Sequence, residues 1–108
     1  MLTMIEALAE PKRFEIVEYL RTGSRSVNEI ADGLGMRQPQ VSKHLRVLNE
    51  AGLVERHIQA QSRIYELRAE PFRELGGWVE TFRALWGGRM DRLDDLLQAL
   101  ADEKETKN

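Results

Sequence analysis

Near the middle of the sequence, several polar side chains that can bind an anionic or hydrogen-bonding partner stand close together. They are Gln38, Gln40, Ser42 and Lys43. Amide side chains can form paired hydrogen bonds, and lysine and serine can bind anionic oxygen atoms. The surrounding stretch, QPQVSKHLRVLNEAGL, is apolar at Val41, Leu45 and Leu48, which is the spacing of one buried side of a helix. One helix can therefore be buried on one side and present polar residues on the other.

These residue types do not indicate catalysis. Ser42 and His44 could suggest a nucleophile and its base, but residues two apart point about 200° from each other on a helix and cannot pair. We expect His44 to be packed or to face phosphate, and His57 to be exposed or bound to backbone. The chain has no cysteine, which excludes disulfides and thiolate metal sites. The protein is therefore not expected to be an enzyme.

A capped helix precedes the polar helix. Ser26 and Glu29 form the pattern of a capping box, which predicts that a helix begins in SVNEIADGL. Gly35 is predicted to end that helix. Its inward-facing residues are predicted to be Val27, Ile30, Ala31 and Leu34.

A short turn through Met36 and Arg37 then leads to the polar helix. Pro39 suits the first position of that helix, with Gln38 as its N-cap. Gly52 is predicted to mark its end. The two helices are thus joined by the brief turn of a helix-turn-helix unit.

Two further helices are predicted at the N-terminus. Ile5 and Leu8 mark a short amphipathic helix that stops before Pro11, because the residue before a proline avoids helical geometry. Pro11 suits the first turn of the next helix, PKRFEIVEYLR. The buried stripe of that helix is predicted to be Phe14, Val17 and Leu20.

After the polar helix, two runs rich in β-branched and aromatic residues predict a β-hairpin. The runs are LVERHI and RIYEL, joined by QAQS. Pro71 is then predicted to open a long C-terminal helix.

That C-terminal helix carries a continuous apolar stripe with a mean spacing of about 3.5 residues, the repeat of helices packed lengthwise. The stripe comprises Phe72, Leu75, Val79, Phe82, Trp86, Met90, Leu93, Leu97 and Leu100, widened by Trp78, Leu85 and Leu96. A small domain cannot easily cover so long an apolar face, so self-association is favoured over a core helix. The glycine pairs Gly76-Gly77 and Gly87-Gly88 are best explained by packing that tolerates them or by a bend. We expect one domain over 1–101 and a frayed tail over 102–108.

Charge is unevenly distributed along the 108 residues. Residues 36–68 hold six basic and three acidic side chains, whereas the segments before and after have net charges of −2 and −3. A basic middle between acidic flanks suggests a local anion-binding surface, although charge alone does not decide this. No apolar run is long enough to span a membrane, and the N-terminus lacks the basic cluster of a secretory signal. A cytoplasmic protein without membrane contact is expected.

Helix, turn, helix and hairpin follow one another in the order of a winged helix-turn-helix. The major groove of DNA is about 12 Å wide and admits one helix, whose N-terminal side chains meet base edges.

The stretches ALAEPKRFEIVEYL, SVNEIADGLGMRQPQVSKHLRVLNEAGLVERH and SRIYEL resemble the ArsR/SmtB repressor family over roughly residues 4–100. This resemblance implies a mainly helical homodimer with a hairpin wing, joined through its terminal helices. It implies a repressor that binds an imperfect inverted repeat in double-stranded DNA.

The resemblance also assigns roles to residues. Gln38, Gln40, Ser42 and Lys43 would enter the major groove, and Gln61 and Arg63 at the hairpin tip would approach the minor groove. We expect backbone contacts from Arg37, Arg46 and Arg56. The expected dimer interface comprises Ile5, Leu8, Phe72, Leu75, Trp78, Val79, Phe82, Trp86, Met90, Leu93 and Leu97.

The metal sites for which this family is best known do not carry over. Where the family has cysteines in its third helix, this chain has Val27, Asn28, Glu29 and Ile30, and it has no histidine after His57. Asp91, Asp94 and Asp95 are more simply read as a solvated face. No cofactor or metal is therefore expected, and the chain resembles a non-metal-sensing branch.

Two other functions are compatible with the same sequence. One is a sensor that binds an unidentified effector in a noncanonical pocket near the dimer helices. The other is a winged-helix module that binds proteins rather than DNA, against which the polar and basic set at the start of the 38–50 helix argues.

Overall fold

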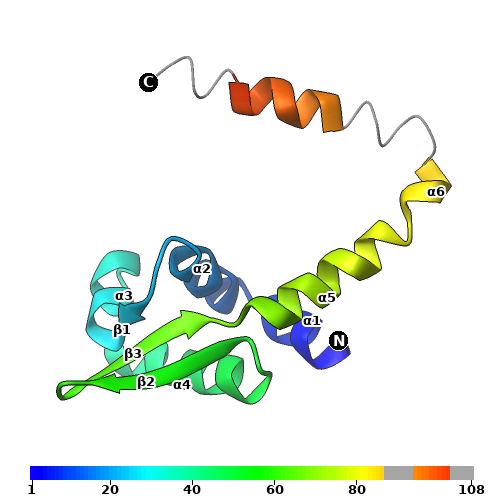
Figure 1. Ribbon diagram of the computed structural model, residues 1–108. Helices are drawn as coiled ribbons and strands as arrows, with labels where there is room; N and C mark the ends of the chain where they lie inside the picture. Colours follow the sequence, from blue (N-terminus) through cyan, green and yellow to red (C-terminus); the bar gives the residue numbers. More distant parts are fainter. Residues whose placement is uncertain (87–93, 103–108) are drawn as a thin grey trace. The chain divides into compact units, whose positions relative to one another are not determined.

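The computed structural model describes residues 1–86 and 94–102, which belong to two compact units, 1–75 and 76–108 (Figure 1). The helices and strands, in chain order, are α1 (Leu2–Leu8), α2 (Pro11–Leu20), β1 (Arg25–Ser26), α3 (Val27–Leu34), α4 (Gln38–Glu50), β2 (Val54–Gln59), β3 (Ser62–Leu67), α5 (Ala69–Glu80) and α6 (Arg83–Trp86). Residues 94–102 are also helical. No helix in the described ranges is both long enough and apolar enough to cross a membrane.

Helix α3 begins and ends where the sequence predicts. The Ser26 hydroxyl accepts a hydrogen bond from the Glu29 N–H at 3.1 Å, and the Glu29 carboxylate accepts one from the Ser26 N–H at 2.9 Å. Gly35 ends the helix in the left-handed conformation, with φ of 63°, which costs a residue without a Cβ little. The predicted capping box and glycine stop are both confirmed.

Helix α4 begins one residue earlier than predicted. Its N-cap is Arg37, in an extended conformation and without a side-chain cap, so Gln38 is the first helical residue. Pro39 follows at the second position, where a missing N–H also costs nothing because the first turn has no intrahelical acceptor for it. The helix ends at Glu50, and Gly52 follows its C-cap with φ of 78°.

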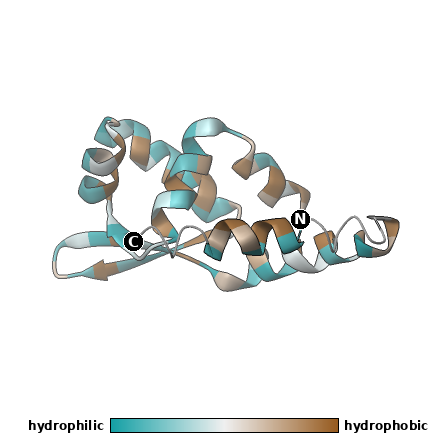
Figure 2. Ribbon diagram, turned by 90° about the horizontal axis from the view of Figure 1, so that it is seen from above, coloured by the Kyte–Doolittle hydropathy of each residue, from teal (hydrophilic) through white to brown (hydrophobic). Residues whose placement is uncertain are grey.

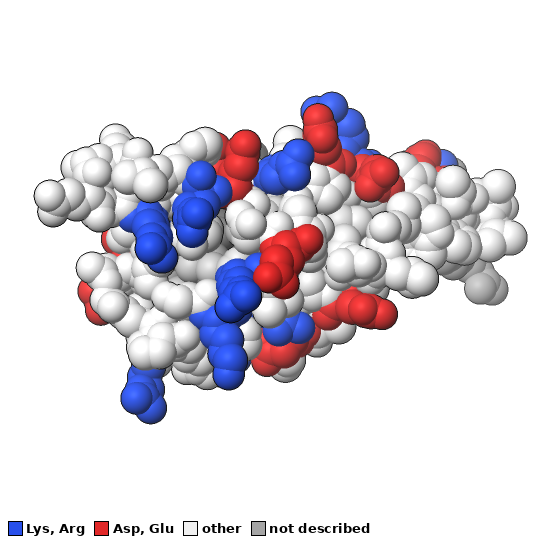
Figure 3. Space-filling view, turned by 90° about the horizontal axis from the view of Figure 1, so that it is seen from below, with Lys and Arg blue, Asp and Glu red and all other residues white. Residues whose placement is uncertain are grey.

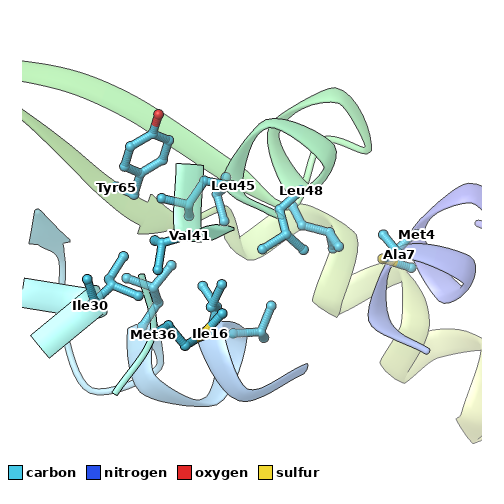
Figure 4. Close-up of a cluster of buried hydrophobic side chains, with 14 residues drawn as sticks. Met4, Ala7, Ile16, Ile30, Met36, Val41, Leu45, Leu48 and Tyr65 are labelled. Atoms are coloured by element: carbon cyan, nitrogen blue, oxygen red, sulfur yellow. The ribbon is translucent and has the colours of Figure 1, made fainter. Parts of the chain in front are cut away.

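The core of residues 1–75 lies where α1 to α4 meet the base of the hairpin. Figure 4 shows Ile16, Ile30, Val41 and Leu45 pointing toward one another from three helices. The buried hydrophobic residues are Met4, Ala7, Ile16, Val17, Leu20, Ile30, Ala31, Met36, Val41, Leu45, Leu48, Leu53, Val54 and Tyr65. In Figure 2, hydrophobic and hydrophilic turns alternate along these helices, as amphipathic packing requires.

Two apolar stripes differ from the predicted ones. Phe14 is 53% exposed, and α2 is buried instead through Ile16, Val17 and Leu20. Phe14 and Ile16 are two residues apart and point to nearly opposite sides of the helix, so only one of them can reach the core. On α1, Met4 and Ala7 are buried, whereas the predicted Ile5 and Leu8 are only half-buried.

The sheet has three antiparallel strands in the order β1-β3-β2. Its register joins Val54 to Leu67 and Gln59 to Ser62, so the hairpin turn is only Ala60-Gln61 rather than the predicted QAQS. Ala60 takes a positive φ of 57°. The pairing of β1 with β3 was not predicted, because a two-residue strand is too short to show an alternating pattern.

The prediction of one unbroken C-terminal helix from Pro71 is wrong within the described residues. Helix α5 begins two residues before Pro71 and ends at Glu80. The Thr81 hydroxyl donates to the Trp78 carbonyl at 2.6 Å, and the N–H groups of Phe82 and Leu85 donate to carbonyls three residues back. Such bonds tighten a chain out of α-helical geometry.

The break therefore falls at Thr81 and Phe82 rather than at a glycine pair. Gly76 and Gly77 lie inside α5. The second glycine pair, with Met90 and Leu93 of the predicted stripe, lies outside the described residues.

Candidate nucleic-acid interface

The polar side of α4 is exposed because the opposite, apolar side of the helix is buried in the core. Val41, Leu45 and Leu48 are each 0% exposed. Met36, in the turn before α4, is buried too, and its N–H donates to the Ala31 carbonyl at 2.9 Å. Together these contacts fix both the position and the rotation of α4. The predicted contact residues Gln38, Gln40, Ser42 and Lys43 all remain exposed.

Two hollows flank the start of α4. One is lined by Ser26, Val27, Asn28, Gln38, Ser42, Gln61, Ser62 and Arg63, and the other by Arg37, Pro39, Gln40 and Lys43. The first hollow brings the start of α4 together with the hairpin turn, although these residues are about twenty positions apart in the sequence. Of the residues predicted for the major and minor grooves, Gln38, Ser42, Gln61 and Arg63 share it.

Helix α3 also contributes to this hollow. The Gln38 amide donates a hydrogen bond to the Asn28 carboxamide oxygen, which ties the first residue of α4 to α3. From the sequence, Asn28 and Ser62 had no predicted role in binding, and Ser26 was predicted only as a helix cap. Their one signal is polarity on an exposed surface, and only the tertiary packing of α3 against α4 and the hairpin distinguishes them from other polar residues.

Basic side chains gather on the face that carries α4 and the hairpin (Figure 3). In the described parts of the chain, no ion pair is formed by Arg37, Lys43, Arg56 or Arg63. Arg46 differs, because its Nε lies 3.3 Å from Glu50 Oε1. Both of these side chains are exposed, so that pair is weak.

The Ser26–Glu29 cap also affects the ionisation of the Glu29 carboxylate. Hydrogen bonds from the Ser26 N–H and from the Ser26 side chain hold the pKa of Glu29 below its ordinary value, and Arg25 adds a smaller attraction. The carboxylate is therefore ionised at neutral pH, at the N-terminus of α3 where a negative charge is favourable.

The histidines occupy separate places. His44 is largely buried on α4, with its Nδ1 3.8 Å from Glu10 Oε2, so it packs against the start of α2. Of the two roles expected for His44, the structure supports the packed one. His57 lies on β2 and is half exposed, with its Nε2 2.8 Å from Glu66 Oε1.

Among the described residues expected at a dimer interface, some pack against the core and others are exposed. Leu8, Phe72 and Leu75 are partly buried and pack against the core. Exposed apolar side chains begin further along α5, where Trp78 and Val79 are each 45% exposed, and include Leu97 at 55%. Trp78 packs edge-on against Phe82, with ring centroids 5.0 Å apart.

The helix-turn-helix of α3 and α4 is followed by an antiparallel hairpin, and the hairpin shares a hollow with α4. This arrangement defines a winged helix-turn-helix. A family model described as bacterial regulatory protein, arsR family, matches residues 10–56. A regulator of Mycobacterium tuberculosis, the HTH-type transcriptional regulator Rv2034, is 42% identical over 84 residues, covering 76% of this chain and 78% of that protein. The chain belongs to the arsR family of bacterial regulatory proteins.

Two further comparisons extend this result. The transcriptional repressor SmtB of M. tuberculosis is 41% identical over 64 residues, which cover 59% of this chain and 47% of that protein. The chain therefore spans about half the length of this relative. The solution structure of the homodimeric winged helix-turn-helix DNA-binding domain Mb0332 of Mycobacterium bovis has a TM-score of 0.59 and 27% identity, covering 99% of this chain and 82% of that one.

Proposed function

We propose that this protein is a dimeric transcriptional repressor that acts in the cytoplasm by binding an imperfect inverted repeat in double-stranded DNA. The observation that carries the proposal is the hollow shared by the start of α4 and the hairpin turn. A helix and a wing held side by side can contact a major groove and the adjacent minor groove together.

Within this proposal, the amides of Gln38 and Gln40 and the ammonium of Lys43 meet base edges. Gln38 is already held by Asn28, so its orientation is set before DNA binds. Preorganised side chains lose less conformational entropy on binding. Ser42 enters the major groove with them. The phosphate contacts come from Arg37, Arg46 and Arg56, while Gln61 and Arg63 reach the minor groove.

Self-association supplies the symmetry that an inverted repeat requires. We assign it to α1, α5 and the helical segments that follow, whose exposed apolar side chains include Trp78, Val79 and Leu97. The homodimeric state of the M. bovis domain supports this assignment. We therefore propose that both the DNA-binding and the dimerisation role belong to residues 1–101.

Selection of bound fragments from genomic DNA, followed by a salt titration, tests the proposal. We expect one inverted repeat to be enriched, with an affinity that falls steeply as salt rises because neutralised phosphates release counterions. Recovery of DNA no different from random fragments would reject DNA binding and favour a protein-binding module.

Substitutions then separate base contacts from backbone contacts. Gln40→Ala or Lys43→Ala should weaken binding to the selected repeat by about 1–3 kcal/mol and relax its base preference, whereas Arg63→Ala should weaken all sites more evenly. Arg21→Ala is the matched control, because Arg21 is exposed at the C-cap of α2 and paired with Glu18. Unchanged affinity in Arg63→Ala would remove the hairpin from the interface.

A further inference from the structure

Three side chains with metal-binding atoms converge on one face of the hairpin. Glu55 lies directly opposite Glu66 in the register of β2 and β3, and His57 follows Glu55 by two residues. Residues two apart on a strand share a face, so all three side chains project to the same side. One ligand atom from each of them lies within 4.8 Å of the others.

The imidazole occupies a position between the two carboxylates. His57 Nε2 is 2.8 Å from Glu66 Oε1 and 3.9 Å from Glu55 Oε2. The three side chains are about half exposed, so an ion from solvent can reach them.

The pairing of the two glutamates is unfavourable by itself. Like charges directly opposite each other on neighbouring strands destabilise a sheet. Glu55 and Glu66 form such a pair. Positive charge held between them would offset this repulsion. A proton on His57 or a bound cation could supply it.

The ligand types favour a transition-metal ion as the source of that charge. One imidazole nitrogen with carboxylate oxygens is a set that binds Zn²⁺ and similar ions, at about 2.0–2.2 Å from each donor atom. Mg²⁺ and Ca²⁺ prefer oxygen ligands throughout, so the imidazole disfavours them. Three protein ligands on two neighbouring strands would leave further coordination positions for water.

We propose that Glu55, His57 and Glu66 bind one divalent transition-metal ion of the zinc class on the wing. The bound ion joins β2 to β3. It lies on the opposite face of the hairpin from Arg56 and Arg63, since Arg56 is one position from Glu55 and Arg63 is three positions from Glu66, both odd offsets along a strand. The site is also separate from the third-helix and C-terminal-helix positions at which the family resemblance would place a metal. It does not depend on the DNA-binding function.

Calorimetry on the full chain tests the site, after treatment with a chelator and exchange into buffer without it. Titration with ZnCl₂ should show one ion bound per chain. His57→Gln, Glu55→Gln and Glu66→Gln should each weaken binding roughly tenfold or more, since even changes behind the ligands can cost that much. Circular dichroism establishes that each variant is folded.

Two control variants keep the test specific. His44→Gln removes the other histidine of the chain, and Glu74→Gln removes an exposed carboxylate on α5. Neither should change zinc affinity. Equal loss in His44→Gln, or no loss in His57→Gln, would overturn the proposal.

Exchange of backbone amides with deuterated water gives a second readout. Zinc should slow exchange across β2 and β3 of the wild-type protein and leave exchange in the His57→Gln variant unchanged. A wing whose exchange responds to pH but not to zinc would identify the proton as the occupant and would also overturn the proposal.

Discussion

At the scale of single residues, neighbouring side chains on α4 differ sharply in their exposure. Leu45 is 0% exposed, whereas its neighbour Arg46 is exposed. The proposed DNA-contact surface therefore depends on the core residues of α4, because they set the rotation of the helix.

Truncation of Leu45 measures that dependence. Leu45→Ala should lower the free energy of unfolding by about 2–5 kcal/mol, since it removes buried methyl groups and leaves a cavity. Phe14→Ala is the control, because the Phe14 side chain is 53% exposed. Its removal should lower the free energy of unfolding much less, although phenylalanine is larger than leucine. Urea denaturation followed by circular dichroism compares the two. Similar costs would mean that Phe14 is covered in solution.

The Glu29 carboxylate predicts a pH dependence of stability. Its pKa is lower in the folded chain than in the unfolded chain, so its contribution is present above the unfolded value and is lost as pH falls through the folded value. Glu29→Gln keeps a hydrogen-bond acceptor but removes the charge. The variant should be less stable than wild type at pH 7, and the difference should disappear in acid. Urea midpoints measured from pH 7 to pH 3 test this, and a constant difference would contradict it.

At the scale of elements, helices α3 and α5 end for different reasons. Helix α3 has a capping box and a left-handed glycine, both of which are local sequence patterns. Helix α5 continues through Gly76 and Gly77 and ends at Glu80, where Thr81 bonds back to the chain. A glycine pair thus weakens a helix without ending it when neighbouring residues still favour the helix.

Alanine at these glycines should therefore stabilise the protein. A Cβ at Gly76 or Gly77 would meet nothing within 4 Å, and both have ordinary helical backbone angles. The double substitution should raise the free energy of unfolding by about 0.5–1 kcal/mol per site.

Gly33→Ala is the contrasting variant. A Cβ there would collide with the ring of Tyr19, which also holds Arg25 at 4.5 Å over its face. Thermal unfolding should show a gain for Gly76→Ala/Gly77→Ala that Gly33→Ala does not share. A loss in the double variant would indicate that another backbone approaches these glycines closely.

At the scale of the whole molecule, several large apolar side chains among the described residues are exposed. Trp78, Val79, Leu85, Leu96, Leu97 and Leu100 are each at least 45% exposed. The proposed dimer would cover these side chains, as a partner covers apolar residues at interaction sites.

A charge placed on this surface should dissociate the dimer. Trp78→Glu should shift sedimentation equilibrium from a dimer to a monomer and, by removing the second half-site contact, weaken binding to the inverted repeat. Phe14→Glu tests an exposed aromatic residue on α2 and should leave the dimer intact. An unchanged dimer in Trp78→Glu would place the interface elsewhere.

Much of this molecule is determined by local patterns. The stripe of Val41, Leu45 and Leu48, the Ser26–Glu29 cap and the alternation along the hairpin each lie within a few residues of sequence. Their structures depend on contacts between near neighbours. The helix-turn-helix, the hairpin and the polar set on α4 could therefore be predicted from the sequence.

Other features depended on tertiary packing. The pairing of β1 with β3 and the contact of Asn28 with Gln38 join segments that only the fold brings together. The choice of Ile16 rather than Phe14 for the core also depends on the elements packed around α2. The same is true of Glu55, His57 and Glu66, whose convergence follows from strand register. Sequence periodicity specifies which sides of an element are apolar, but competition among all elements for one core decides which side is buried and which distant residues meet.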